Sequence, residues 1–136
     1  MISWVFDTNV IVAAHLSATG PPGRLLAEVY AGRLRLTYDA RLAAEYREVL
    51  LRAKFAFPPE TVRSFLRVLD DQDLVIAAPL TLELPDPDDL MFLEVAASAG
   101  DGVLVTGNLR HFPEASRGSV RVLSPAEAWA LRLDGG

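Results

Sequence analysis

The sequence contains no cysteine, which excludes disulfide bonds, zinc–thiolate sites and thiol nucleophiles. It also lacks long apolar runs, and none approaches the ~20 residues that a membrane-spanning helix needs. The N-terminal segment Met1–Trp4 has no basic region followed by an apolar stretch, which a signal peptide would show. We therefore expect a cytoplasmic protein with no membrane segment.

Lysine is nearly absent, because 12 of the 13 basic residues are arginine and only Lys54 is lysine. The formal net charge of −5 argues against a protein that binds nucleic acid by charge alone. It does not argue against a nuclease, since a bound metal ion would offset acidic residues clustered around it. Arginine is the better bidentate partner for phosphate, although a GC-rich genome would produce the same arginine excess.

The length of 136 residues suits a single domain spanning 1–136. Apolar patterning and capping residues predict strands that alternate with helices. The predicted strands are 4–6, 34–38, 74–77, 102–106 and 120–123, and the predicted helices are 9–16, 24–31, 40–51, 60–70, 86–100 and a last one beginning at Ser124. This order predicts an α/β fold with a mostly parallel central sheet in three α/β/α layers. Such sheets bind ligands at the carboxyl ends of their strands.

Asp7 directly follows the first predicted strand, at that ligand-binding edge. The simplest interpretation is an N-cap of the next helix, which is worth about 1 kcal/mol. The alternative interpretation is a carboxylate that binds a ligand. Asn9, two residues further on, is suited to hold that carboxylate or a metal-bound water.

A second carboxylate, Glu45, falls at the edge of the apolar face of the helix that Asp39 caps. Burying a carboxylate alone is costly, so Glu45 needs a partner. Either a site at the sheet edge or a surface arginine, such as Arg41 or Arg52, would provide one. Glu48 lies well outside the apolar face and is expected on the surface.

Acidic residues are densest at 86–89, where Asp86 is suited to cap a helix that begins with proline. Helical geometry places Asp86 and Asp89 on one side of that helix and Asp88 roughly opposite. The helix beyond is apolar nearly all round, which indicates a buried element. Asp89 is therefore the stronger site candidate. Asp86 is the next candidate, and helix capping accounts for a larger part of its presence.

Thr106, Gly107 and Asn108 follow another predicted strand at the same edge of the sheet. Gly107 permits close approach of the backbone to a ligand, and the neighbouring side chains offer oxygens to a metal, a water or a phosphate. An ordinary turn is the alternative. Arg110 and His111 lie in the same loop and are candidates for contacts with a substrate phosphate.

Carboxylates that gather in one crevice repel one another unless a cation is present. Hard oxygen ligands suit Mg²⁺ or Mn²⁺, and such ions activate water and stabilise an in-line phosphoryl displacement. The acidic residues therefore predict metal-assisted hydrolysis of a phosphate ester.

Segments along nearly the whole chain resemble PIN-domain proteins, in the same order. They are an Asp-Thr-Asn motif after the first strand, a glutamate-bearing helix, an acidic segment and a strand-end loop, at 5–12, 42–50, 84–101 and 104–108. The chain is similar to single-domain members that act as toxins of bacterial or archaeal toxin–antitoxin pairs. The resemblance implies a ribonuclease dependent on Mg²⁺ or Mn²⁺, a homodimer, and a small antitoxin protein that blocks the site.

By the same match, Asp7, Glu45 and Asp89 would be the catalytic, metal-binding acids, and Asp86 would support them. Many family members have aspartate where this chain has Asn108, so one expected negative charge and a second metal ion are in question. Neighbouring polar side chains would support the acids, and arginines would contact RNA. These supporting residues are Asn9, Thr106 and Asn108, and the arginines are Arg24, Arg47, Arg52 and Arg110.

Two other functions compete with a ribonuclease. A non-catalytic binding module that kept the fold is favoured by Asn108. A Mg²⁺-dependent phosphohydrolase of small phosphates is less favoured, because a haloacid-dehalogenase-like enzyme would have aspartate at Asn9. A Rossmann or P-loop nucleotide-binding protein is not expected, since no glycine-rich loop follows the first strand.

Overall fold

A computed structural model describes residues 1–98 and 100–135. Its centre is a five-stranded sheet in the order β3-β2-β1-β4-β5, in which neighbouring strands are parallel. The strands are β1 (Ser3–Phe6), β2 (Arg35–Tyr38), β3 (Asp73–Leu74), β4 (Val103–Val105) and β5 (Arg121–Leu123). The predicted α/β class and parallel sheet are confirmed.

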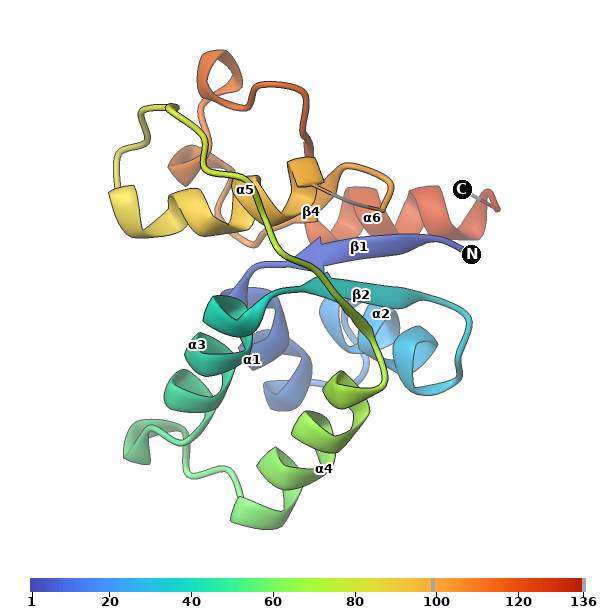
Figure 1. Ribbon diagram of the computed structural model, residues 1–136. Coiled ribbons are helices and arrows are strands. Elements are labelled where there is room, and N and C mark those ends of the chain that lie inside the picture. The colour runs from blue at the N-terminus through green and yellow to red at the C-terminus, as the bar shows by residue number, and fades with distance from the viewer. Residues whose placement is uncertain (99, 136) are drawn as a thin grey trace.

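Helices cover both faces of this sheet, and Figure 1 shows α1, α3 and α4 on one side of β1 and β2, with α5 on the other. The helix α6 packs against α2. The α-helices are α1 (Thr8–Leu16), α2 (Pro21–Tyr30), α3 (Ala40–Leu50), α4 (Pro59–Asp70), α5 (Leu90–Ser98) and α6 (Pro125–Leu133). Short 3-10 turns are η1 (Ala53–Phe55), η2 (Pro87–Asp89), η3 (Leu109–His111) and η4 (Glu114–Ser116).

The central strand β1 is buried along its whole length, as the apolar run 4–6 predicts for a strand covered on both faces. Helix α5 is also a core element, because its residues from Phe92 to Ala96 are all buried. Capping follows the sequence as well. Asp39 accepts a hydrogen bond from the backbone of Leu42 at the start of α3, and Ser124 and Glu127 form a capping box at the start of α6.

The predicted boundary of the second helix is wrong. Helix α2 begins at Pro21 and not at Arg24, with Gly20 as its N-cap. A proline fits the first helical position because its missing N–H would have no partner there in any case. The Gly-Pro-Pro-Gly segment is therefore the helix start and not the end of a loop.

The predicted third strand, 74–77, is also wrong in extent, because β3 covers only Asp73–Leu74. Its neighbour β2 ends at Tyr38, whose carbonyl still accepts a hydrogen bond from the N–H of Val75 at 2.8 Å. Beyond that point the chain of β2 turns into α3, so no strand remains to pair with 76–77. Similarly, η2 precedes α5, and the α-helix starts only at Leu90.

The strand order reverses direction between β1 and β4. From β1 the chain passes through α1 and α2 to β2, whereas β4 is reached from α5 on the other side of the sheet. The carboxyl ends of two such strands form the crevice where parallel sheets bind ligands. Asp7 follows β1 and Thr106 follows β4, so both residues lie at this crevice. Among the helices in the described part of the chain, none has the length and apolar character needed to cross a membrane.

Candidate active site

Asp7 is buried at the start of α1, yet its side chain does not cap that helix. Its Oδ2 instead accepts hydrogen bonds from Thr106 Oγ1 at 2.8 Å and from Asn9 Nδ2 at 3.3 Å. The N-cap interpretation therefore does not explain this aspartate. Its carboxylate is held at the crevice between β1 and β4.

The loop after β4 is tied to the same aspartate. The N–H of Gly107 donates to Asn9 Oδ1 at 2.9 Å, and the N–H of Asn108 donates to Thr106 Oγ1 at 3.1 Å. A Cβ atom at Gly107 would lie 3.2 Å from Asn9 Oδ1, so glycine is what allows this close approach. The predicted supporting residues thus bond to Asp7 or to one another.

Glu45 points to the crevice and not to a surface arginine. Its Oε2 accepts a hydrogen bond from the hydroxyl of Thr8, the residue after Asp7. The hydroxyl of Tyr46, a fully buried side chain, donates to the backbone carbonyl of Phe6 and fixes α3 against the end of β1. Glu48, in contrast, forms an exposed ion pair with Arg52, as expected of a surface residue.

Asp89 ends the η2 turn and faces the loop after β4. Its Oδ2 lies 3.1 Å from Nδ1 of His111, and the other ring nitrogen of His111 lies 3.0 Å from Asn108 Nδ2. Among the described residues, this Asp89 oxygen is buried but has no hydrogen-bond partner of good geometry. Asp86 is exposed, and its side chain accepts a hydrogen bond from the N–H of Asp88, which is the predicted capping role.

These carboxylates influence one another's ionisation. Burial raises the pKa of Asp7 to about 6, the hydrogen bond from Thr106 opposes the shift, and the charges of Asp89 and Glu45 add to it. The pKa of Asp89 is raised by burial and next by Asp86, while His111 opposes the shift. Negative charge is therefore concentrated at the crevice, and a cation there would be stabilised.

A family model described as PIN domain matches residues 3–110. The chain belongs to the PIN-domain family. The match includes the residues just described at the crevice, from Asp7 to Asn108. Searches of curated proteins and of solved structures gave no match. PIN domains are generally nucleases, so the family supports a nuclease-type fold for this chain.

PIN domains usually bind divalent metal ions, and the donor chemistry of this one fits such an ion. The carboxylates of Asp7 and Asp89, whose pKa values are raised by burial, have the hard oxygen donors that suit Mg²⁺ or Mn²⁺. Within 1–98 and 100–135, however, no group of three or more His, Cys, Asp or Glu side chains is gathered closely enough to hold a metal. Asp7 and Glu45 are bonded to threonine hydroxyls, each through one carboxylate oxygen.

The arginines predicted to contact RNA are only partly gathered around this PIN-domain site. Arg52 lines a groove that also contains Glu45, and Arg110 is exposed in η3 next to His111. Arg24 on α2 and Arg47 on α3 are exposed, and neither is among the residues that line the groove containing Glu45.

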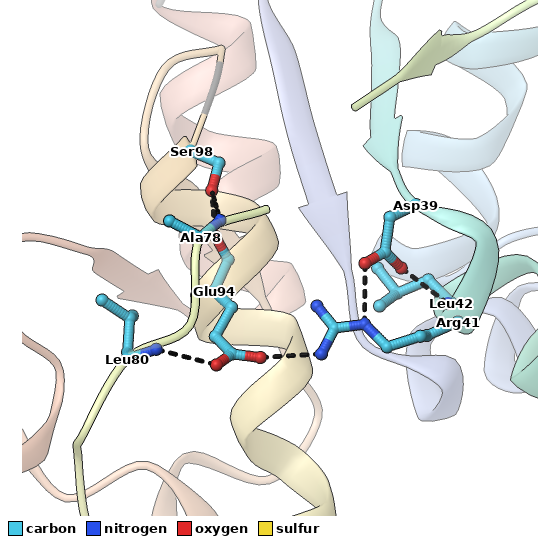
Figure 2. A network of polar contacts seen from close by, with 7 residues as sticks. All are labelled: Asp39, Arg41, Leu42, Ala78, Leu80, Glu94 and Ser98. Carbon is cyan, nitrogen blue, oxygen red and sulfur yellow. Dashed lines mark hydrogen bonds and ion pairs between the residues drawn. The ribbon is translucent and has the colours of Figure 1, made fainter. Parts of the chain in front are cut away.

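Sequence reasoning missed a residue that holds the elements of the site together. Glu94, a buried acid in α5, accepts hydrogen bonds from Arg41 Nη1 at 2.7 Å and from the N–H of Leu80 at 2.8 Å (Figure 2). Arg41 also donates to Asp39 at 2.8 Å, at the N-terminus of α3. The network therefore joins α3, which carries Glu45, to α5 and to the connection that precedes Asp89. The available signal was a single acid inside an otherwise apolar helix.

Proposed function

We propose that this PIN domain is a divalent-metal-dependent endoribonuclease that hydrolyses RNA phosphodiester bonds. The observation that carries the proposal is Asp7, a buried carboxylate at the β1–β4 crevice that does not cap its helix. Its raised pKa reflects burial and the nearby charges of Asp89 and Glu45. Such an arrangement is costly without a cation, and perturbed carboxylates in a crevice are typical of functional sites.

In this proposal Asp7, Glu45 and Asp89 hold Mg²⁺ or Mn²⁺, with Asp86 close by. When bound, such an ion activates water and stabilises the charge that develops on a phosphate in an in-line displacement. Thr106 and Asn9 orient the Asp7 carboxylate through their hydrogen bonds. Substitution of a residue that orients a metal ligand typically lowers metal affinity or activity about 10- to 100-fold.

We propose further that the chain is the toxin of a toxin–antitoxin pair, that it forms a homodimer, and that a small antitoxin protein blocks its site. The support is the resemblance of its segments at 5–12, 42–50, 84–101 and 104–108 to those of toxin members of the family. Induced expression in a bacterial host should then stop growth, and the Asp7→Asn variant should not. Equal toxicity of the two proteins would contradict this role.

The test of the nuclease is cleavage of labelled single-stranded and structured RNAs with Mn²⁺, Mg²⁺ or EDTA. Parent protein should cleave only with metal. Asp7→Asn should be slower by about a hundredfold or more, since loss of a partner that only orients a metal ligand already costs about 10- to 100-fold and Asp7 is proposed as a ligand itself. Glu60→Gln is the control, because the ion pairs of Glu60 in the described part of the chain are with exposed arginines of its own helix, α4.

A folded protein that neither cleaves RNA nor binds Mn²⁺ would contradict the proposal. That outcome would favour a non-catalytic binding module. Two observations would then explain the absence of nuclease activity. Asn108 has a neutral side chain, and the described residues contain no cluster of three or more potential metal ligands.

A further inference from the structure

A groove of about 370 Å³ runs from the candidate active site along α1 and α3. Its walls are the apolar side chains of Val12, Ala13 and Leu16 from α1 and of Val49 from α3, and Phe55 of η1 closes one end. The seven-residue step from Asn9 to Leu16 makes it about 10 Å long at the rise of an α-helix. Its volume lies in the range of pockets that bind small organic ligands.

The other end of the groove is the site itself, because Thr8, Asn9 and Glu45 belong to both. A substrate whose reacting phosphate sits at Asp7 and Glu45 therefore has its neighbouring nucleotide at the groove. A second hollow of about 420 Å³, lined by α1, α2 and α4 residues such as Ala27, contains none of the site residues.

Phe55 presents an aromatic ring held in a fixed orientation. It stacks on Phe57 with ring centroids 5.6 Å apart and planes 13° apart, and the ammonium of Lys54 lies 5.1 Å from its centroid. Ala56, which lies between Phe55 and Phe57 in the sequence, has a φ of 53°. This left-handed conformation is uncommon in residues other than glycine. Constrained backbone of this kind is frequent at ligand-binding positions.

Positive charge borders the same end of the groove. Arg52 lines it, and among residues 1–98 and 100–135 its ion pair is with Glu48, at 3.2 Å between two exposed side chains. Exposed pairs of this type contribute little, so a phosphate is able to replace Glu48 as the partner of Arg52. Single-stranded nucleic acid binds to surfaces of this kind. Its bases stack on apolar and aromatic side chains, and its phosphates pair with arginine at the rim.

We infer that this groove binds a nucleobase of single-stranded RNA next to the scissile phosphate, with Phe55 against the base and Arg52 on the backbone. The inference rests on the ribonuclease activity proposed above and locates the contact for one base of the substrate on this chain. A peptide partner, such as the antitoxin proposed above, would use the same apolar walls. It would leave RNA cleavage by the parent independent of any single base, and the abasic scan below tests this.

The experiment measures kcat and KM for cleavage of single-stranded RNA with Mn²⁺ by the parent, Phe55→Ala and Ala13→Phe. Phe55→Ala should raise KM about five- to hundredfold, which is the range that alanine substitution of base-stacking aromatic residues generally gives. Ala13→Phe should do the same by filling the groove, with an unchanged Mn²⁺ affinity. Ala27→Phe, which fills the separate hollow, is the matched control and should cleave like the parent.

Abasic scanning identifies the occupant. Oligonucleotides that each lack one base should include one that the parent cleaves poorly, and Phe55→Ala should show no further loss with that oligonucleotide. The inference would be overturned if the parent cleaved RNA and both groove variants had the same KM as the parent. It would also be overturned if cleavage fell equally at every abasic position, or if Ala27→Phe raised KM as much as the groove variants do. No cleavage by the folded parent would instead overturn the proposed function itself, so the two failures are distinguishable. Ala13→Phe keeps the test valid if Phe55→Ala unfolds.

Discussion

Asp7 must stay ionised to bind a cation, although the folded protein makes that ionisation costly. Burial is the main cause of its pKa near 6, against an ordinary value of 3.8. Because the folded-state pKa is above the unfolded one, the stability that Asp7 contributes is fully present below pH 3.8 and is lost as the pH rises through 6. At about 1.4 kcal/mol per pKa unit, the loss is about 3 kcal/mol.

This effect is testable with Asp7→Asn, which removes the titrating group and keeps its size. In urea unfolding with EDTA between pH 4 and 7, the parent should lose about 2 kcal/mol more stability than the variant as the pH rises, because part of the total is already lost at pH 4. Curves that stay parallel would show that Asp7 ionises normally in the folded protein.

Asn108 is the position where the site lacks an expected negative charge. Its side-chain nitrogen lies 3.0 Å from His111, which in turn faces Asp89. Asn108→Asp should bind Mn²⁺ about tenfold more tightly, since affinity for hard cations rises with the number of charged ligands. Calorimetric titration of Mn²⁺ measures it. Ser119→Asp adds the same charge outside the site and should leave affinity unchanged, and a Mn²⁺ affinity unaltered in Asn108→Asp would place residue 108 outside the metal site.

At the scale of elements, Glu94 connects α3, which carries Glu45, to α5 and to the chain that leads to Asp89. It is buried and accepts charge-assisted hydrogen bonds from α3 and from the chain before η2. Hydrogen bonds to charged groups contribute about 1.5–3 kcal/mol each by general experience. Removing the charge should therefore loosen α3 and the Asp89 segment relative to each other.

We expect Glu94→Gln to lower the free energy of unfolding by about 2 kcal/mol and to weaken Mn²⁺ binding as well. Glu60→Gln breaks ion pairs between exposed side chains and should change stability by less than about 0.5 kcal/mol. Urea denaturation and Mn²⁺ titration of both variants compare them. If the two variants were equally stable, the buried network would have no greater role than a surface pair.

For the whole molecule, the crevice links metal binding to folding. A cation that binds only the folded chain stabilises it by about 2.7 kcal/mol when its concentration is 100 times its Kd. Addition of Mn²⁺ should therefore raise the thermal unfolding midpoint of the parent and relieve the repulsion among its carboxylates. Asp7→Asn should show a much smaller rise. A parent midpoint that is insensitive to Mn²⁺ up to millimolar concentrations would argue against a metal site.

The sequence by itself determined the fold class and the order of elements, because apolar periodicity, caps and breakers are local signals. The burial of β1 and α5 and the caps at Asp39 and Ser124 were readable in this way. It also indicated Asp7, Glu45 and Asp89, since strand ends and helix faces restrict where such acids lie. The end of β3 was not readable, because it depends on where the neighbouring strand β2 stops.

Only the tertiary structure decided what each acid contacts. Asp7 has the sequence context of an N-cap, and its bond to Thr106, 99 residues away, is what assigns its carboxylate to the crevice. Glu45 had two plausible partners, and the approach of α1 to α3 selected Thr8 over a surface arginine. The bond of Glu94 to Arg41 and the groove beside Glu45 likewise arise between segments far apart in sequence. Such contacts form only when the strands are ordered in the sheet, so local sequence patterns do not predict them.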